Sequence, residues 1–154
     1  MRSFVDLGLF LAAVALGIGT VLPMVGGVRS TEAPLSGLRD GFPNGDPTSL
    51  AVAGLPLYES LAVPLAAAAV LLLIAALFDS VVTGWAGSVL ALTVCATAAV
   101  RIFQSHGDYL VENHSTALTN QNGFVLLVSG TLVSLVCCLV SLRRPSRRPA
   151  RDRP

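Results

Sequence analysis

The chain has 154 residues, of which 53% are hydrophobic and 12% are charged, and its mean hydropathy is +0.73. The length leaves room for one domain, and the composition excludes disordered, collagen-like and disulfide-stapled classes of protein. The hydrophobic excess lies outside the usual range of soluble proteins, so we expect an integral membrane protein of the all-α class. The formal net charge of +1 says nothing about partners, but the distribution of the charges does.

Four apolar runs in the sequence are long enough to cross a bilayer. A hydrocarbon core about 30 Å thick requires roughly 20 residues in a helix that rises about 1.5 Å per residue. The runs that meet this length are 4–25, 56–78, 81–103 and 123–142. They predict four transmembrane helices in a bundle that makes up a single domain, residues 1–142. Only Asp79 and Ser80 separate the second run from the third, so these two helices should form a tight hairpin.

The first run has an alternative interpretation as a cleaved signal peptide, because Arg2 precedes its apolar residues. The run is longer than the apolar region of a typical signal peptide, which has about 7–15 residues. Its Ala-x-Ala match, Ala13-Val14-Ala15, lies in the middle of the run rather than after it. We therefore expect the first span to be retained.

Arginines near the ends of the spans predict the orientation in the membrane. All ten basic residues are Arg, and seven of them fall on the side that holds both termini, against three on the other side. This asymmetry predicts that both termini are inside and that two loops, about 28–55 and 104–122, lie outside. The tail 143–154 is rich in Arg and Pro and should be disordered in the cytoplasm. Its arginines expected to face anionic lipid are Arg143, Arg144, Arg147 and Arg148.

The first outer loop combines turn-forming residues with large apolar ones. Proline and glycine interrupt it repeatedly, and exposed clusters of apolar side chains are unfavourable in water. Its apolar side chains are Leu35, Leu38, Phe42, Leu50 and Val52. We therefore expect the two outer loops to fold against each other. Arg101, at the outer end of the third span, should pair with an acid of either loop.

The second outer loop holds both histidines of the chain, near two acids. Residue types that bind divalent metals occur there as His106, Asp108, Glu112 and His114. Their spacing matches no zinc motif such as H-E-x-x-H. We therefore expect no bound metal, and we interpret Asp108 and Glu112, with Arg101, as charges of the outer face.

Small residues recur at intervals of four in the last two spans. Gly130, Ser134 and Cys138 have this spacing in the fourth span. The third span repeats it with Ala91, Cys95 and Ala99. Because small residues allow helix backbones to approach closely in lipid, we predict that these six positions are helix-packing sites.

The sequence offers no sign of an enzyme or a proton-coupled transporter. It contains no G-x-S-x-G, Walker A, dinucleotide-binding or H-E-x-x-H pattern, and no ionisable residue falls in the middle of a span. We expect no enzymatic activity, no cofactor and no nucleic-acid partner.

Two stretches resemble a known group of proteins. They are GIGTVLPMVGG followed by STEAPLSGLRDG after the first span, and NQNGFVLLVSGTLVSLVCCLVSLRR at the last span. Both are similar to small, uncharacterised four-span membrane proteins of high-GC actinobacteria, in which a Gly-x-x-Leu-Pro end of the first span leads into a Gly-rich outer loop. The resemblance implies a multi-pass protein of the plasma membrane and no particular reaction.

Two functions agree with these observations. The first is a structural or accessory membrane protein that presents its outer loops to a partner in the envelope, in a membrane complex or in a homo-oligomer. The alternative is a small transporter or channel for an uncharged or lipidic solute, lined by the second and third spans. Membrane lipids are partners in both cases.

Overall fold

The computed structural model describes residues 2–25, 27–42, 51–112 and 122–142 and confirms the all-α class. A 3-10 helix and a short antiparallel ribbon, which the sequence analysis did not predict, accompany the α-helices of the described residues. The elements in chain order are α1 (Arg2–Gly19), β1 (Pro23–Val25), β2 (Val28–Arg29), α2 (Ser36–Asp40), η2 (Leu57–Glu59), α3 (Ala62–Phe78), α4 (Val81–Glu112) and α6 (Asn122–Leu142).

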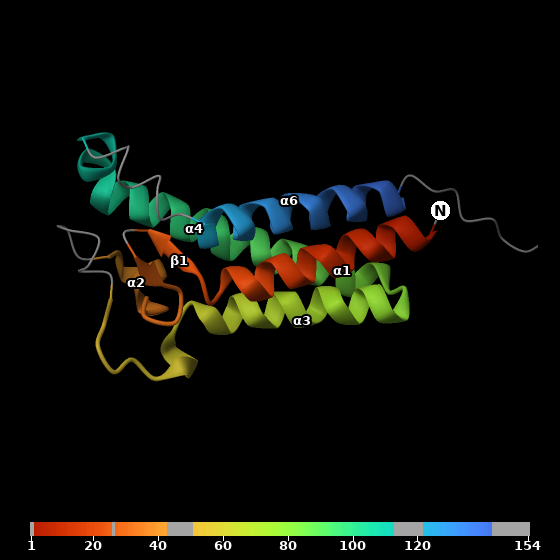
Figure 1. The fold of residues 1–154 in the computed structure, drawn as a ribbon, viewed down its shortest axis with the longest axis horizontal. Coiled ribbons are helices and arrows are strands. Elements are labelled where there is room, and N and C mark those ends of the chain that lie inside the picture. Colours follow the sequence, from red (N-terminus) through yellow and green to blue (C-terminus); the bar gives the residue numbers. More distant parts are fainter. Residues whose placement is uncertain (1, 26, 43–50, 113–121, 143–154) are drawn as a thin grey trace, which may run out of the picture.

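The four long helices form a bundle in which neighbours run antiparallel (Figure 1). α1 packs against α3 and α6, and α4 packs against the same two helices, more extensively against α3 than against α6. The start of α1, the α3–α4 connection and the end of α6 lie together at what we call the hairpin end. The described residues between α1 and α3, 20–25, 27–42 and 51–61, gather at the opposite end and form what we call the cap.

The tight hairpin between α3 and α4 is present. Asp79 adopts the left-handed conformation with φ 50, which ends α3. The Ser80 N–H donates to the Ala75 carbonyl at 3.2 Å, and the Ser80 and Thr83 hydroxyls lie 2.8 Å apart. Two residues therefore suffice to reverse the chain.

Two of the four apolar runs form shorter helices than the sequence predicts. α1 ends at Gly19 rather than at residue 25, and the Thr20 hydroxyl closes its last turn by donating to the Gly17 carbonyl at 2.6 Å. Pro23 has no N–H to continue the helix and instead begins β1. α3 begins at Ala62 rather than at residue 56, because the preceding residues form η2.

The third run forms a longer helix than predicted. α4 continues without a break from Val81 to Glu112, so residues 104–112 are helical and do not belong to a loop. This stretch contains no proline, and adding residues to an existing helix is much easier than nucleating one. The remaining part of the predicted second loop, 113–121, and the tail 143–154 lie outside the described residues.

Two helices of the described chain are long and apolar enough to cross a membrane, Val81–Ser105 within α4 and Asn122–Leu142. The apolar stretches Phe4–Gly19 and Ala62–Phe78 are shorter.

Candidate functional site

The cap is a folded unit built around a small apolar core. The space left within this core is only about 10 Å³, so its side chains are in close contact. Six of the side chains that fill it are Met24, Val28, Ala33, Phe42, Leu61 and Ile102. The Phe42 ring packs against the backbone of Gly37 in α2, and Ile102 comes from α4. The apolar residues of the first loop therefore include one, Phe42, that anchors the cap to the bundle.

Main-chain hydrogen bonds close the cap across long sequence distances. The Leu35 N–H donates to the Glu59 carbonyl at 2.7 Å, and the Leu61 N–H donates to the Ala33 carbonyl at 3.0 Å. The buried Ser30 hydroxyl donates to the Thr20 carbonyl at 2.6 Å, which ties β2 to the end of α1. These contacts satisfy backbone groups that a buried loop would otherwise leave unpaired.

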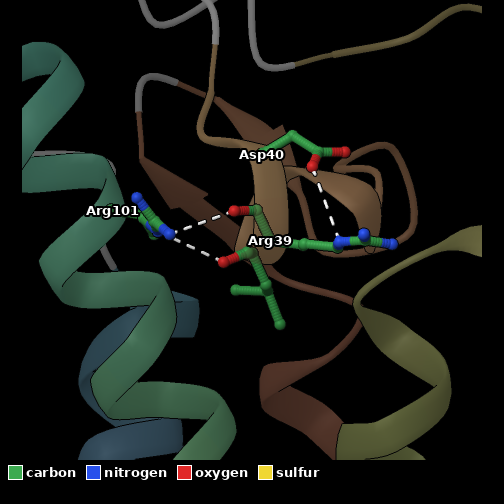
Figure 2. A network of polar contacts seen from close by, with 4 residues as sticks. Arg39, Asp40 and Arg101 are labelled. Carbon is green, nitrogen blue, oxygen red and sulfur yellow. Dashed lines mark hydrogen bonds and ion pairs between the residues drawn. The ribbon is translucent and has the colours of Figure 1, made fainter.

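Arg101 fastens the cap to α4, but in a different way from the prediction. Its guanidinium donates through Nε to the Leu38 carbonyl at 3.2 Å and through Nη2 to the Arg39 carbonyl at 3.0 Å (Figure 2). The predicted partner was an acid, whereas the partners of Arg101 among the described residues are backbone carbonyls at the end of α2. The side chains of Asp46, Asp108 and Glu112 lie outside the described residues. The last carbonyls of a helix lack partners within it, and a cation is favourable at that end. Nearby, the Ser105 hydroxyl donates to the Phe42 carbonyl at 3.1 Å.

We expect Arg101→Gln to loosen the cap and lower the free energy of unfolding by about 1.5 kcal/mol, the lower end of the range for hydrogen bonds to charged groups, because Arg101 is partly exposed. The measurement is proteolysis of the cap in native membranes, together with thermal unfolding in detergent. Arg29→Gln removes the same charge from an exposed side chain of β2 and serves as the control. Equal protease resistance of the two variants would contradict the role of Arg101.

A surface groove of about 460 Å³ lies in the cap between α2 and η2. Its apolar walls include Pro34, Leu35, Leu55 and Tyr58. Its charged residues, among those that the structure describes, are Arg39, Asp40 and Glu59. The groove therefore combines apolar surface with one cation and two anions.

The Arg39 side chain points away from Arg101 and towards Asp40 (Figure 2). Its Nε lies 3.8 Å from the Asp40 carboxylate, and the two side chains are 92% and 72% exposed. An ion pair this exposed contributes about 0–1 kcal/mol. Both groups are therefore available to a ligand, while Arg101 holds the backbone of Arg39 in place.

The small residues of the fourth span lie inside the bundle. Gly130, Ser134 and Cys138 are all buried on α6. A Cβ at Gly130 would lie 3.2 Å from the Ala12 carbonyl oxygen of α1, and the Cys138 sulfur lies 3.4 Å from the Ser88 hydroxyl of α4. The stripe thus contacts two neighbouring helices.

The corresponding stripe on α4 drifts around the helix. Ala91 and Cys95 are buried, but Ala99 is only partly buried, and Ala98 takes the next buried position. A straight helix has 3.6 residues per turn, so each step of four turns the position by about 40° around the axis. On α4 the second step brings Ala99 to the edge of the packed face. Ala99 instead borders an apolar groove of about 170 Å³ between α4 and α6.

The sequence analysis missed the small residues of α1, which match those of α6. Gly8 faces Cys137, Ala12 and Ala15 face Gly130, and Gly19 faces Gly123 and Leu127. The signal was present as Gly8, Ala12, Ala15 and Gly19, at intervals of four, three and four. α1 and α6 therefore approach closely from Gly8 to Gly19 of α1.

α3 and α4 are also in direct contact. A Cβ at Gly87 would lie 3.1 Å from the Leu72 side chain and 3.2 Å from the Ala68 carbonyl oxygen. At this level no space separates the two helices that were predicted to line a solute path.

The part of the chain that the structure describes holds no group of three or more His, Cys, Asp or Glu residues that could bind a metal. His106, Asp108 and Glu112 lie on the extension of α4, but their side chains are outside the description, as is His114. The arginines of the tail, from Arg143 onwards, are outside it as well.

Comparison of the chain with models of protein families, with curated proteins and with solved structures finds no match. Any functional assignment therefore rests on the cap, its groove and the surface of the bundle.

Proposed function

We propose that the protein is a four-span membrane protein with a structural or accessory role, whose folded cap is its recognition element outside the plasma membrane. The observation that supports the membrane placement is the polarity of the bundle. Polar side chains are buried at its centre, namely Ser88, Thr131 and Ser134. Large apolar side chains cover the outside of all four long helices; examples, which are 49–56% exposed, are Leu11, Val70, Val89 and Leu132.

The short helices fit this arrangement. With 18 and 17 residues, α1 and α3 are each about 26 Å long. Helical spans range from about 17 to 25 residues, and apolar neighbours such as Leu22 and Leu61 lengthen both at the cap end. α4 is longer, and its extension beyond Arg101 would stand outside the membrane beside the cap.

The accessory role is supported by the way in which the cap is built. Hydrogen bonds from Arg101 and Ser105 and the packing of Phe42 hold it on the bundle. This arrangement presents a folded surface in a constant orientation, which is what recognition of another protein of the envelope, or of a second copy of the chain, requires.

The topology is tested by labelling single cysteines in intact cells with a membrane-impermeant reagent, after the three native cysteines have been replaced. We expect Ser36→Cys, exposed at the start of α2, to react from outside. We expect Ser146→Cys, in the tail, to react only after the membrane has been permeabilised. Labelling of Ser146→Cys in intact cells would rule out the proposed orientation.

The recognition role is tested with a photo-reactive amino acid in place of Arg29, an exposed position of β2 that lies outside the groove. We expect a discrete protein adduct on irradiation of living cells. The control carries the same amino acid in place of Val89, which is 49% exposed on α4 and should meet lipid only. Absence of a protein adduct at position 29 would contradict a protein partner for the cap.

A further inference from the structure

The groove between α2 and η2 lies at the level at which α3 begins. Only two residues separate η2 from the first residue of α3, and η2 projects to the side of the bundle (Figure 1). Leu57 and Tyr58 of η2 are 67% and 73% exposed. If α3 enters the bilayer at Ala62, as the proposed function requires, these two side chains lie at the outer membrane interface. Tyrosine is enriched at this depth in membrane proteins.

The apolar surface of α3 continues into η2. Val63 and Val70 are exposed on α3, and Leu57, in η2 just before the helix, is exposed as well. A lipid that lies along α3 would therefore place its headgroup at the groove. The groove is lined by both apolar and charged side chains.

The charges of the groove identify the headgroup. Arg39 can donate to a phosphate, because a guanidinium forms strong hydrogen bonds with phosphate oxygens. Asp40 and Glu59 can accept hydrogen bonds from an ammonium group. A purely anionic headgroup would be repelled by the two carboxylates, and a purely cationic ligand would be repelled by Arg39. We propose that the groove binds the phosphoethanolamine headgroup of a zwitterionic phospholipid in the outer leaflet.

This proposal also separates two zwitterionic headgroups. The ammonium of phosphoethanolamine has three N–H donors for the carboxylates. The trimethylammonium of phosphocholine has none and is recognised through aromatic faces, of which the groove offers only Tyr58 among the described lining residues. We therefore expect phosphatidylethanolamine to bind more tightly than phosphatidylcholine.

The test is native mass spectrometry of the full chain in a neutral detergent, titrated with phosphatidylethanolamine, phosphatidylcholine or phosphatidylglycerol of identical acyl chains. We expect phosphatidylethanolamine to form an adduct at roughly tenfold lower concentration than the other two, since one additional hydrogen bond to a charged group is enough for that ratio. Equal adduct formation by all three lipids, or a preference for phosphatidylglycerol, would overturn the proposal.

Variants of the charged groove residues test whether the lipid binds at the groove. We expect Arg39→Gln and Glu59→Gln each to weaken the phosphatidylethanolamine adduct roughly tenfold. The control is Arg29→Gln, which makes the same change of charge as Arg39→Gln at an exposed cap position outside the groove and should leave the adduct unchanged. The replaced side chains are exposed, and unchanged elution in size exclusion verifies that each variant is folded. An equal loss in the Arg29→Gln control would show that the preference reflects net charge and would overturn the site.

Because the inference rests on the proposed membrane placement, the two must be able to fail separately. Extraction of cell membranes with alkaline carbonate tests whether the protein is embedded in the membrane. Release of the protein would contradict the proposed function. A protein that stays in the membrane but shows no preference among the lipids would overturn only the headgroup site.

Discussion

Replacing Gly123 by alanine is expected to lower the free energy of unfolding by about 1–3 kcal/mol, the range measured when atoms are added to a packed interior. The first turn of α6 rests on the chain where α1 has ended. A Cβ at Gly123 would lie 2.7 Å from the carbonyl oxygens of both Leu22 and Pro23. Neither atom belongs to a flexible side chain, so the helix itself must shift.

The matched control for this prediction is Gly17→Ala. A Cβ at Gly17 has no neighbour within 4 Å, and the residue lies inside α1. Alanine in a helix is favoured over glycine by about 0.5–1 kcal/mol, so this variant should be as stable as the natural protein or more so. Thermal aggregation and unfolding by SDS, both in detergent solution, provide the comparison. A Gly123→Ala variant as stable as Gly17→Ala would show that α6 does not rest on residues 22–23.

Replacing Ser134 by leucine is expected to push α6 away from its neighbours. The free energy of unfolding should fall by about 1–3 kcal/mol. Ser134 is 0% exposed, and its hydroxyl donates to the Thr131 carbonyl of its own helix at 2.8 Å. It lies on the stripe between Gly130, which faces α1, and Cys138, which faces α4. A bulkier side chain therefore cannot turn towards open space.

Val133→Leu is the matched control, since it introduces the same side chain about 100° around the helix. Val133 is 43% exposed and so can grow outward. We expect Val133→Leu to retain the melting temperature of the natural protein in detergent and Ser134→Leu to lose several degrees. Equal midpoints for the two variants would mean that the small residues of α6 face lipid.

Sequence reasoning was least successful at the ends of the helices. Apolar composition continues past Gly19, so it predicts helix for residues 20–25. In the structure, Pro23 instead pairs with Arg29 in the β1–β2 ribbon. Polar composition begins at residue 104, so it predicts a loop from there on. In the structure, α4 extends to Glu112. In both places the composition indicates whether a segment prefers an apolar or an aqueous environment. The end of a helix depends instead on which backbone N–H and C=O groups form hydrogen bonds.

The groove between α2 and η2 could not be predicted from the sequence. Its charged residues, Arg39, Asp40 and Glu59, are ordinary loop residues until Leu35 and Glu59 are hydrogen bonded to each other. The contact that orients Arg39 joins it to Arg101, 62 positions away. No local pattern marks backbone carbonyls as the partners of an arginine, and charge alone pointed to an acid.

Four features follow from the amino-acid sequence without a structure: the all-α class, the four apolar runs, the two-residue hairpin at Asp79 and Ser80, and the stripe of small residues on α6. These features depend on local composition and on spacing along one helix, which are visible without a partner. The tertiary structure alone decided that Gly8 and Gly19 of α1 oppose α6, that Arg101 holds the end of α2, and that a groove opens beside η2. Each of these depends on atoms that are distant in the chain and become neighbours only when the helices pack.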